Sequence, residues 1–118
     1  MSSSAPRFDP MEFLDSATRL SGGASQGDLR SAISRAYYAV FLRARENLAL
    51  AGAITPTRGR ADHRLVVETL RSGGRPEGDE LDKLRARRGR ADYEIGVSIS
   101  KGEANQAIAL ARHLWNRL

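Results

Sequence analysis

The chain has 118 residues, which is the size of one domain with a single hydrophobic core. Lysine and arginine number 19 against 14 acidic residues, and the formal net charge of +5 favours an anionic partner such as RNA, DNA or an acidic protein. The absence of cysteine excludes disulfides and thiolate metal sites, and an aromatic content of 6% argues against RNA recognition on a platform of aromatic rings.

The beginning of the sequence predicts a tail followed by a helix. Residues 1–7 are serine-rich with one proline, which is typical of a flexible N-terminal tail, and the domain is expected over residues 8–118. Asp9 and Pro10 then form a helix start, because an aspartate oxygen caps free N–H groups and proline lacks the N–H that would be unpaired. Gly22 is expected to end this first helix.

The second helix is predicted to be the longest. Ser25 can cap it, and apolar residues keep helical spacing over residues 26–50, a length of about 37 Å. The longest apolar run of the whole chain, residues 36–42, lies within it and is too short to cross a bilayer. No signal-peptide pattern opens the chain, so we expect a soluble, cytoplasmic protein with no contact to a membrane.

Three more helices are predicted in the second half. A third lies within residues 58–72, and a fourth opens near Pro76 and is closed by Gly96. The last begins with a capping box, in which Ser100 is followed three residues later by Glu103. Because no segment alternates at period two for long, the predicted fold class is all-α, an up-and-down bundle of four to five helices.

The fourth helix contains the most unusual stretch, LDKLRARRGRADYE over residues 81–94. Helical spacing puts four of its residues on one apolar stripe: Leu81, Leu84, Ala91 and Ile95. Three charged residues lie on or beside that stripe, namely Arg85, Arg88 and Asp92. Charges at the edge of a buried face are costly unless they are paired or functional. In a binding role, the expected phosphate contacts are Arg85, Arg87, Arg88 and Arg90.

The second helix contains the run SRAYYAVF, in which Arg35 and Tyr38 share one flank. If that flank faces the fourth helix, Arg35 can pair with Asp92 and Tyr38 can donate to the same carboxylate, which predicts a structural polar network of these three residues. A packing rim is the alternative. His63 lies on the inner face of the third helix, as a packing or a catalytic histidine, whereas His113 is expected in solvent. We predict no metal site and no cofactor.

The pair of motifs SRAYYAVF and LRARRGRADYE, with His63 near the start of the third helix, resembles the HEPN domain family. The resemblance is to small standalone members that carry an arginine followed by Ala-Asp-Tyr, and it extends from about Phe8 to Leu118. It implies a helical bundle, commonly a homodimer, here through the second and fourth helices. Many relatives are metal-independent ribonucleases, often the toxin partner of a minimal nucleotidyltransferase antitoxin.

In those ribonucleases an arginine is followed after four to six residues by a histidine, usually with a tyrosine two beyond. Here Arg87 or Arg88 matches the arginine, but Asp92 stands at the place of the histidine and Tyr93 follows directly. We therefore expect a HEPN-type protein of a toxin–antitoxin or nucleotidyltransferase-linked system that binds RNA with its fourth helix and cleaves it poorly. The alternatives are a protein-binding module and an active ribonuclease. In the ribonuclease the arginine stabilises the phosphate, Asp92 orients that arginine, and Tyr93 or His63 bonds to the reacting group.

Overall fold

The computed structural model describes residues 7–118, and within them the chain forms five α-helices and no strand. The helices are α1 (Met11–Ser21), α2 (Gln26–Leu50), α3 (Ala61–Ser72), α4 (Glu77–Tyr93) and α5 (Lys101–Arg117). The predicted all-α bundle is confirmed. The predicted tail, residues 1–7, lies outside the described residues except for Arg7. None of the described helices is long and apolar enough to cross a membrane.

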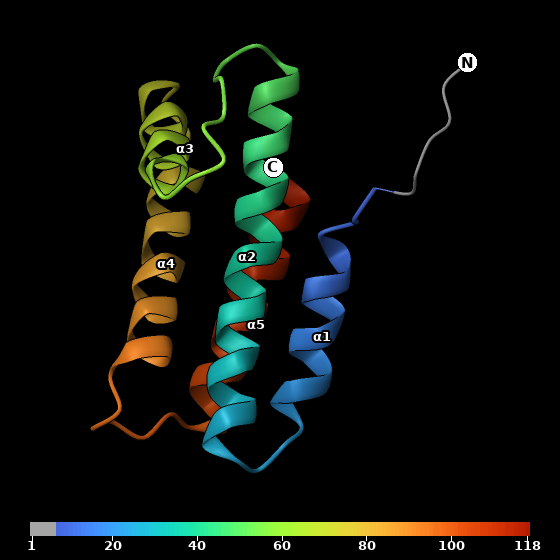
Figure 1. Cartoon of the computed structure of the whole chain (residues 1–118), viewed down its shortest axis with the longest axis vertical. Coiled ribbons are helices and arrows are strands. Elements are labelled where there is room, and N and C mark those ends of the chain that lie inside the picture. The colour runs from blue at the N-terminus through green and yellow to red at the C-terminus, as the bar shows by residue number, and fades with distance from the viewer. Residues whose placement is uncertain (1–6) are drawn as a thin grey trace.

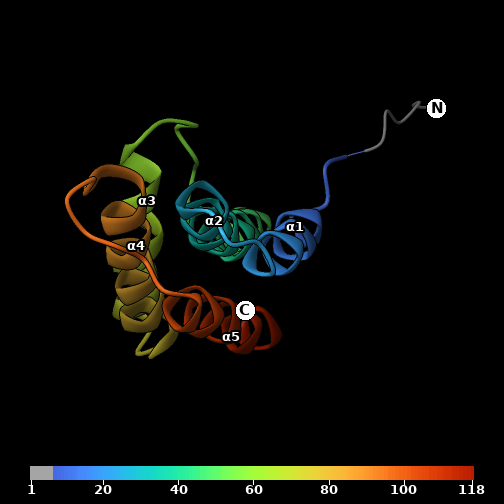
Figure 2. The same cartoon turned by 90° about the horizontal axis from the view of Figure 1, so that it is seen from below.

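Helix α2 is the centre of the bundle and contacts each of the other four helices (Figure 1). Figure 2 shows α1 beside α2, α5 across from them, and the α3–α4 pair along the remaining side. The core contains many fully buried alanines, among them Ala32, Ala36 and Ala39 of α2 and Ala107 of α5, and such small side chains allow helices to approach closely. This close packing fixes how α2 faces α3 and α4, where the polar side chains of interest lie.

Local caps begin three of the helices as the sequence predicts. The Asp9 carboxylate accepts a hydrogen bond from the backbone N–H of Met11 at 2.9 Å. Ser25 caps α2, whose bounds match the predicted ones, and Ser100 and Glu103 form the complete capping box of α5. These ends depend only on residues a few positions apart, so the sequence alone determines them.

One predicted helix bound is wrong. Helix α3 lies within the predicted range of residues 58–72, but α4 ends at Tyr93 rather than at Gly96. Ile95, predicted on the apolar stripe, is therefore 92% exposed. A guanidinium from α2 explains the early end of α4. Arg30 donates to the carbonyl oxygens of Ala91, Glu94 and Val97 and so binds the last turn of α4 together with the turn that follows it.

Candidate functional site

Side chains from α2, α3 and α4 meet in one cluster, which we call the arginine–tyrosine cluster: Tyr37 and Tyr38 of α2, His63 of α3, and Arg88 and Tyr93 of α4. At its centre the hydroxyl of Tyr37 lies 2.5 Å from Nδ1 of His63, although the two residues are 26 positions apart in the chain. Tyr37 is fully buried and His63 is partly buried. Helix α3 therefore places an imidazole against the face of α2 that also contacts α4.

The imidazole is held by aromatic rings on more than one side. His63 stacks on Phe41 with centroids 4.1 Å apart and planes 9° apart. The ring of Tyr37 is also nearly parallel to it at 5.6 Å, and Tyr38 meets it edge-on at 5.9 Å. These contacts restrict the rotation of the ring, so the direction of each nitrogen is fixed by packing.

Arg88 provides the cation of the cluster. Its guanidinium carbon lies 5.7 Å from the ring centroids of both Tyr37 and Tyr38 and 5.8 Å from that of Tyr93, which is within cation–π distance. Its Nη1 lies 3.3 Å from a carboxylate oxygen of Asp92, one helical turn away. The Arg88 side chain is only 14% exposed, and its buried Nε has no hydrogen-bond partner in the described part of the chain. The guanidinium is thus oriented by rings and by one carboxylate.

Burial and nearby charges set the protonation states of the cluster. Burial, together with the positive charges of Arg85 and Arg88, lowers the pKa of His63 from 6.5 to about 4. Burial also raises the pKa of Tyr37 far above its ordinary value, because it disfavours the phenolate. Near neutral pH, the cluster therefore contains a neutral imidazole, a neutral phenol and a charged guanidinium.

A buried carboxylate next to His63 fixes the start of α3. Asp62 is fully buried and accepts hydrogen bonds from the backbone N–H groups of Thr57 and Arg58 and from the Thr57 hydroxyl, at 2.7–2.9 Å. Arg45 of α2 lies 3.6 Å away. Burial alone would raise the pKa of Asp62, but the hydrogen bonds from Thr57 and Arg58 hold it below its ordinary value. Sequence reasoning missed this residue, since its partners lie in a loop without a recognisable pattern.

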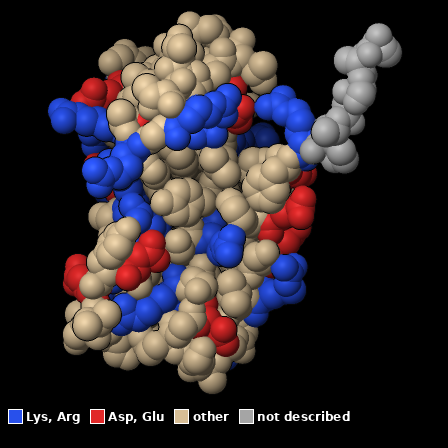
Figure 3. All heavy atoms as spheres, in the orientation of Figure 1, with Lys and Arg blue, Asp and Glu red and all other residues tan. Residues whose placement is uncertain are grey.

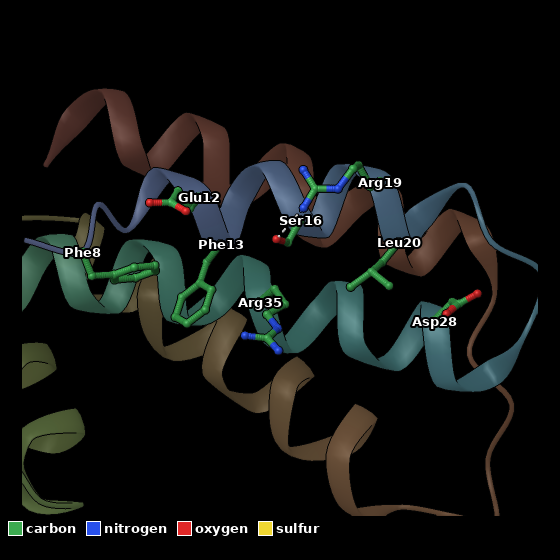
Figure 4. A pocket seen from close by; sticks show the side chains of 8 residues that line it. All are labelled: Phe8, Glu12, Phe13, Ser16, Arg19, Leu20, Asp28 and Arg35. Carbon is green, nitrogen blue, oxygen red and sulfur yellow. Dashed lines mark hydrogen bonds between the residues drawn. The ribbon is translucent and has the colours of Figure 1, made fainter. Parts of the chain in front are cut away.

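The predicted polar network of Arg35, Tyr38 and Asp92 is not formed among the described residues, because neither Arg35 nor Tyr38 bonds to Asp92. Asp92 pairs with Arg88, and the Ser34 hydroxyl lies 3.4 Å from the same carboxylate. Arg35 is not the partner of Asp92 in the described structure, because its guanidinium lies over the ring of Phe13 at 4.9 Å, between α1 and α2 (Figure 4). Arg35 and Asp92 nevertheless line one hollow of about 510 Å³ together with Tyr38, which we call the α2–α4 groove.

The four arginines of α4 do not share one face. Arg85 and Arg88 act on the side of His63, as their effect on its pKa indicates. Arg90 instead forms an ion pair with Glu103 of α5, and Arg87 lines a hollow beside that pair. Figure 3 likewise shows Lys and Arg spread over the viewed face and mixed with acidic residues. The basic stretch of the sequence is thus divided between two flanks of the helix.

The remaining histidine lies apart from the cluster. His113 of α5 has a side chain that is 54% exposed, and its Nε2 lies 2.8 Å from Arg117 and 3.5 Å from Glu80. Among residues 7–118, no group of three or more His, Asp or Glu side chains is arranged to hold a metal ion. The interpretation of His113 as a solvent-exposed residue is confirmed.

Comparison with known proteins identifies the family. The HEPN domain family matches residues 11–118, a range that includes all five helices and every member of the arginine–tyrosine cluster. No curated protein matches the sequence significantly. Both sequence motifs that resemble HEPN proteins, SRAYYAVF in α2 and LRARRGRADYE in α4, lie in the matched range and meet in space through Arg88 and the two tyrosines of α2. The chain belongs to the HEPN domain family.

Proposed function

We propose that this HEPN-type protein binds single-stranded RNA at the arginine–tyrosine cluster and the adjoining α2–α4 groove, and that it cleaves RNA poorly or not at all. The observation that carries the proposal is the position of Arg88 among three tyrosine rings, beside an imidazole. An unpaired base can stack on an arginine or on one exposed aromatic ring without a platform of several rings, and arginines also bind the phosphates. Tyr37 is fully buried and serves to hold the cluster together. Tyr93, 74% exposed at the rim, is the ring best placed to receive a base.

Poor cleavage follows from the chemistry at position 92. Asp92 stands where active relatives of the family have histidine, and it is ion-paired with Arg88. An ionised carboxylate accepts hydrogen bonds but has no proton to give to the leaving oxygen of RNA. The pair therefore suits the orientation of Arg88 toward a phosphate better than it suits acid catalysis.

A metal-independent endoribonuclease is the second candidate, and one observation favours it. His63 of α3 meets the ring of Tyr38 at 5.9 Å, and the guanidinium of Arg88 lies 5.7 Å from the same ring. An imidazole is therefore present in the cluster even though position 92 is an aspartate. In this alternative Arg88 stabilises the phosphorane and Tyr93 or His63 bonds to the reacting phosphate.

Binding is tested by fluorescence anisotropy with a labelled single-stranded RNA in the presence of EDTA. Arg85 has no ion pair among the described residues, so Arg85→Ala removes a phosphate contact with little effect on the fold. We expect it to weaken binding roughly tenfold and to reduce the salt dependence by about one ion. The matched control is Arg112→Ala, which removes an arginine of α5 that bonds to Thr18 of α1.

The same samples distinguish the candidates. Intact RNA after incubation supports the binding function, whereas fragments with cyclic phosphate ends that disappear in the Arg88→Ala variant support the ribonuclease. Equal weakening in Arg85→Ala and Arg112→Ala would assign the effect to net charge rather than to this site. Wild-type protein that neither binds nor cuts RNA would refute both and leave a protein-binding role.

The cellular setting that we propose is a prokaryotic toxin–antitoxin or nucleotidyltransferase-linked system, with a homodimer as the working unit. Ile95, 92% exposed just after the end of α4 and outside the lining of the α2–α4 groove, provides apolar surface that a second copy can cover while the groove stays open to RNA. Co-purification with the product of the adjacent reading frame tests the system. A nucleotidyltransferase found in the complex would support it, and its absence from that locus would contradict it.

A further inference from the structure

We propose that Tyr37 fixes His63 in the tautomer that has its proton on Nε2, so that His63 serves the RNA site as a hydrogen-bond donor to phosphate and not as a base. The identity of the anion rests on the proposed RNA-binding function. The tautomer itself rests only on the geometry of the free protein.

The direction of the hydrogen bond between Tyr37 and His63 follows from the burial of the phenol. Nδ1 of His63 is the single partner of the Tyr37 hydroxyl in the described structure. If Nδ1 had the proton, it would donate to the phenol oxygen, and the hydroxyl proton would point into the core without an acceptor. A buried unpaired donor costs about 1–3 kcal/mol. If Tyr37 donates to Nδ1, both groups are satisfied, and the ring proton must be on Nε2.

The other ring nitrogen is not fully buried. Among the described residues, Nε2 of His63 has no hydrogen-bond partner, and the buried nitrogens that lack one are Nε of Arg43 and Nε of Arg88. The ring is only partly buried and is fixed in orientation by its stack on Phe41. The Nε2–H group is therefore a donor with a set direction, on a ring that meets Tyr38 edge-on, and the centroid of Tyr38 lies 5.7 Å from the guanidinium carbon of Arg88.

A base role would require a free lone pair on the imidazole. The lone pair of Nδ1 is engaged by the Tyr37 hydroxyl, and Nε2 already has its proton. Burial and the charges of Arg85 and Arg88 lower the pKa of His63 to about 4, which disfavours a second proton on the ring. An anionic oxygen of phosphate, in contrast, is a good acceptor for a neutral N–H group placed next to two arginines.

The tautomer is tested by NMR on the uniformly ¹⁵N-labelled full chain near neutral pH. Two-bond correlations between ring nitrogens and carbon-bound protons distinguish a protonated Nε2 from a protonated Nδ1. We expect His63 to show the Nε2–H pattern, and Tyr37→Phe to convert it to a mixture, with His113 as an unchanged internal control. A protonated Nδ1 in the wild-type protein, or an unchanged pattern in Tyr37→Phe, would overturn the assignment.

The donor role is tested with two amides that imitate one ring nitrogen each. In His63→Gln the amide N–H can reach the place of Nε2, whereas in His63→Asn it reaches only the place of Nδ1. We expect His63→Gln to retain RNA affinity within about threefold, and His63→Asn and His63→Ala to lose roughly tenfold, as for one hydrogen bond to a charged group. His113→Ala is the matched control.

Two results would refute the donor role. The first is that His63→Gln binds as weakly as His63→Ala, and the second is that wild-type protein does not bind the RNA probe. In the second case the proposed function fails with it, while the NMR pattern still decides the tautomer on its own. If NMR shows the proton on Nδ1 but the protein still binds RNA, the tautomer assignment is wrong and the proposed function stands.

Discussion

Mild acid should destabilise this protein through His63. Its pKa is 6.5 in an unfolded chain and about 4 in the fold. As the pH falls below 6.5, His63 becomes protonated in the unfolded chain but stays neutral in the folded protein. The free energy of unfolding therefore decreases until the pH reaches about 4. The stabilisation by the neutral ring is fully present above pH 6.5.

The expected loss can be worked from these two pKa values. Linkage gives about 2 kcal/mol between about pH 7 and about pH 5 if the whole difference is effective. The ring is only partly buried, so water screens part of the effect, and we expect about 1 kcal/mol. Two carboxyls also have lowered pKa values, those of Asp62 and Glu103. Their contributions to the free energy of unfolding are lost mainly below their ordinary pKa values of 3.8 and 4.5. The chosen window therefore isolates the histidine.

Urea unfolding followed by circular dichroism at both pH values measures the difference. His63→Phe keeps an aromatic ring on Phe41 but cannot take up a proton, so its free energy of unfolding should not change between the two conditions. The variant leaves the Tyr37 hydroxyl without a hydrogen-bond partner and is less stable at both pH values, so only the change in stability with pH is informative. His113→Gln should behave like the wild type. An equal loss in His63→Phe would refute the reasoning.

Three further substitutions test the packing of α4 and its surroundings. Asp92→Ala should lower the free energy of unfolding by about 1 kcal/mol in the same assay, because the carboxylate is 27% exposed and Arg88 keeps its aromatic contacts without it. A loss of several kcal/mol would mean that the pair is more deeply buried. Gly89→Ala should raise stability by up to about 1 kcal/mol, since a Cβ there meets no atom within 4 Å, and a lower melting temperature would contradict that. Ile95→Asp should convert the proposed dimer to a monomer in light scattering, while a dimer of unchanged affinity would place the interface elsewhere.

The parts of the structure that sequence reasoning predicted well depend on neighbours along the chain. The bounds of α2 follow from Ser25 and from apolar spacing, and the α5 capping box needs only residues 100–103. The pairing of Arg88 with Asp92 is of the same kind, because residues four apart on a helix are adjacent.

The parts that were missed depend on contacts between distant segments. The end of α4 is set by Arg30, which is 61–67 residues away from the carbonyls it binds. Arg35 was expected to turn toward Asp92, but the packing of α1 presents the ring of Phe13 to it instead. No spacing rule within one helix contains this information. One signal was available, since a tyrosine on a core stripe requires a partner for its hydroxyl.

That partner changes how the replacement of the usual histidine by Asp92 is understood. From the sequence, the question was whether the site lacks an imidazole. In the fold, α3 brings His63 to the cluster, and the contact that holds it there occupies its Nδ1. An imidazole can be present in an RNA site and still be unable to accept a proton, because the hydrogen bond that positions it also takes its lone pair. The weak cleavage that we propose then follows from Tyr37 as much as from Asp92, and we expect ribonuclease activity to increase in Tyr37→Phe.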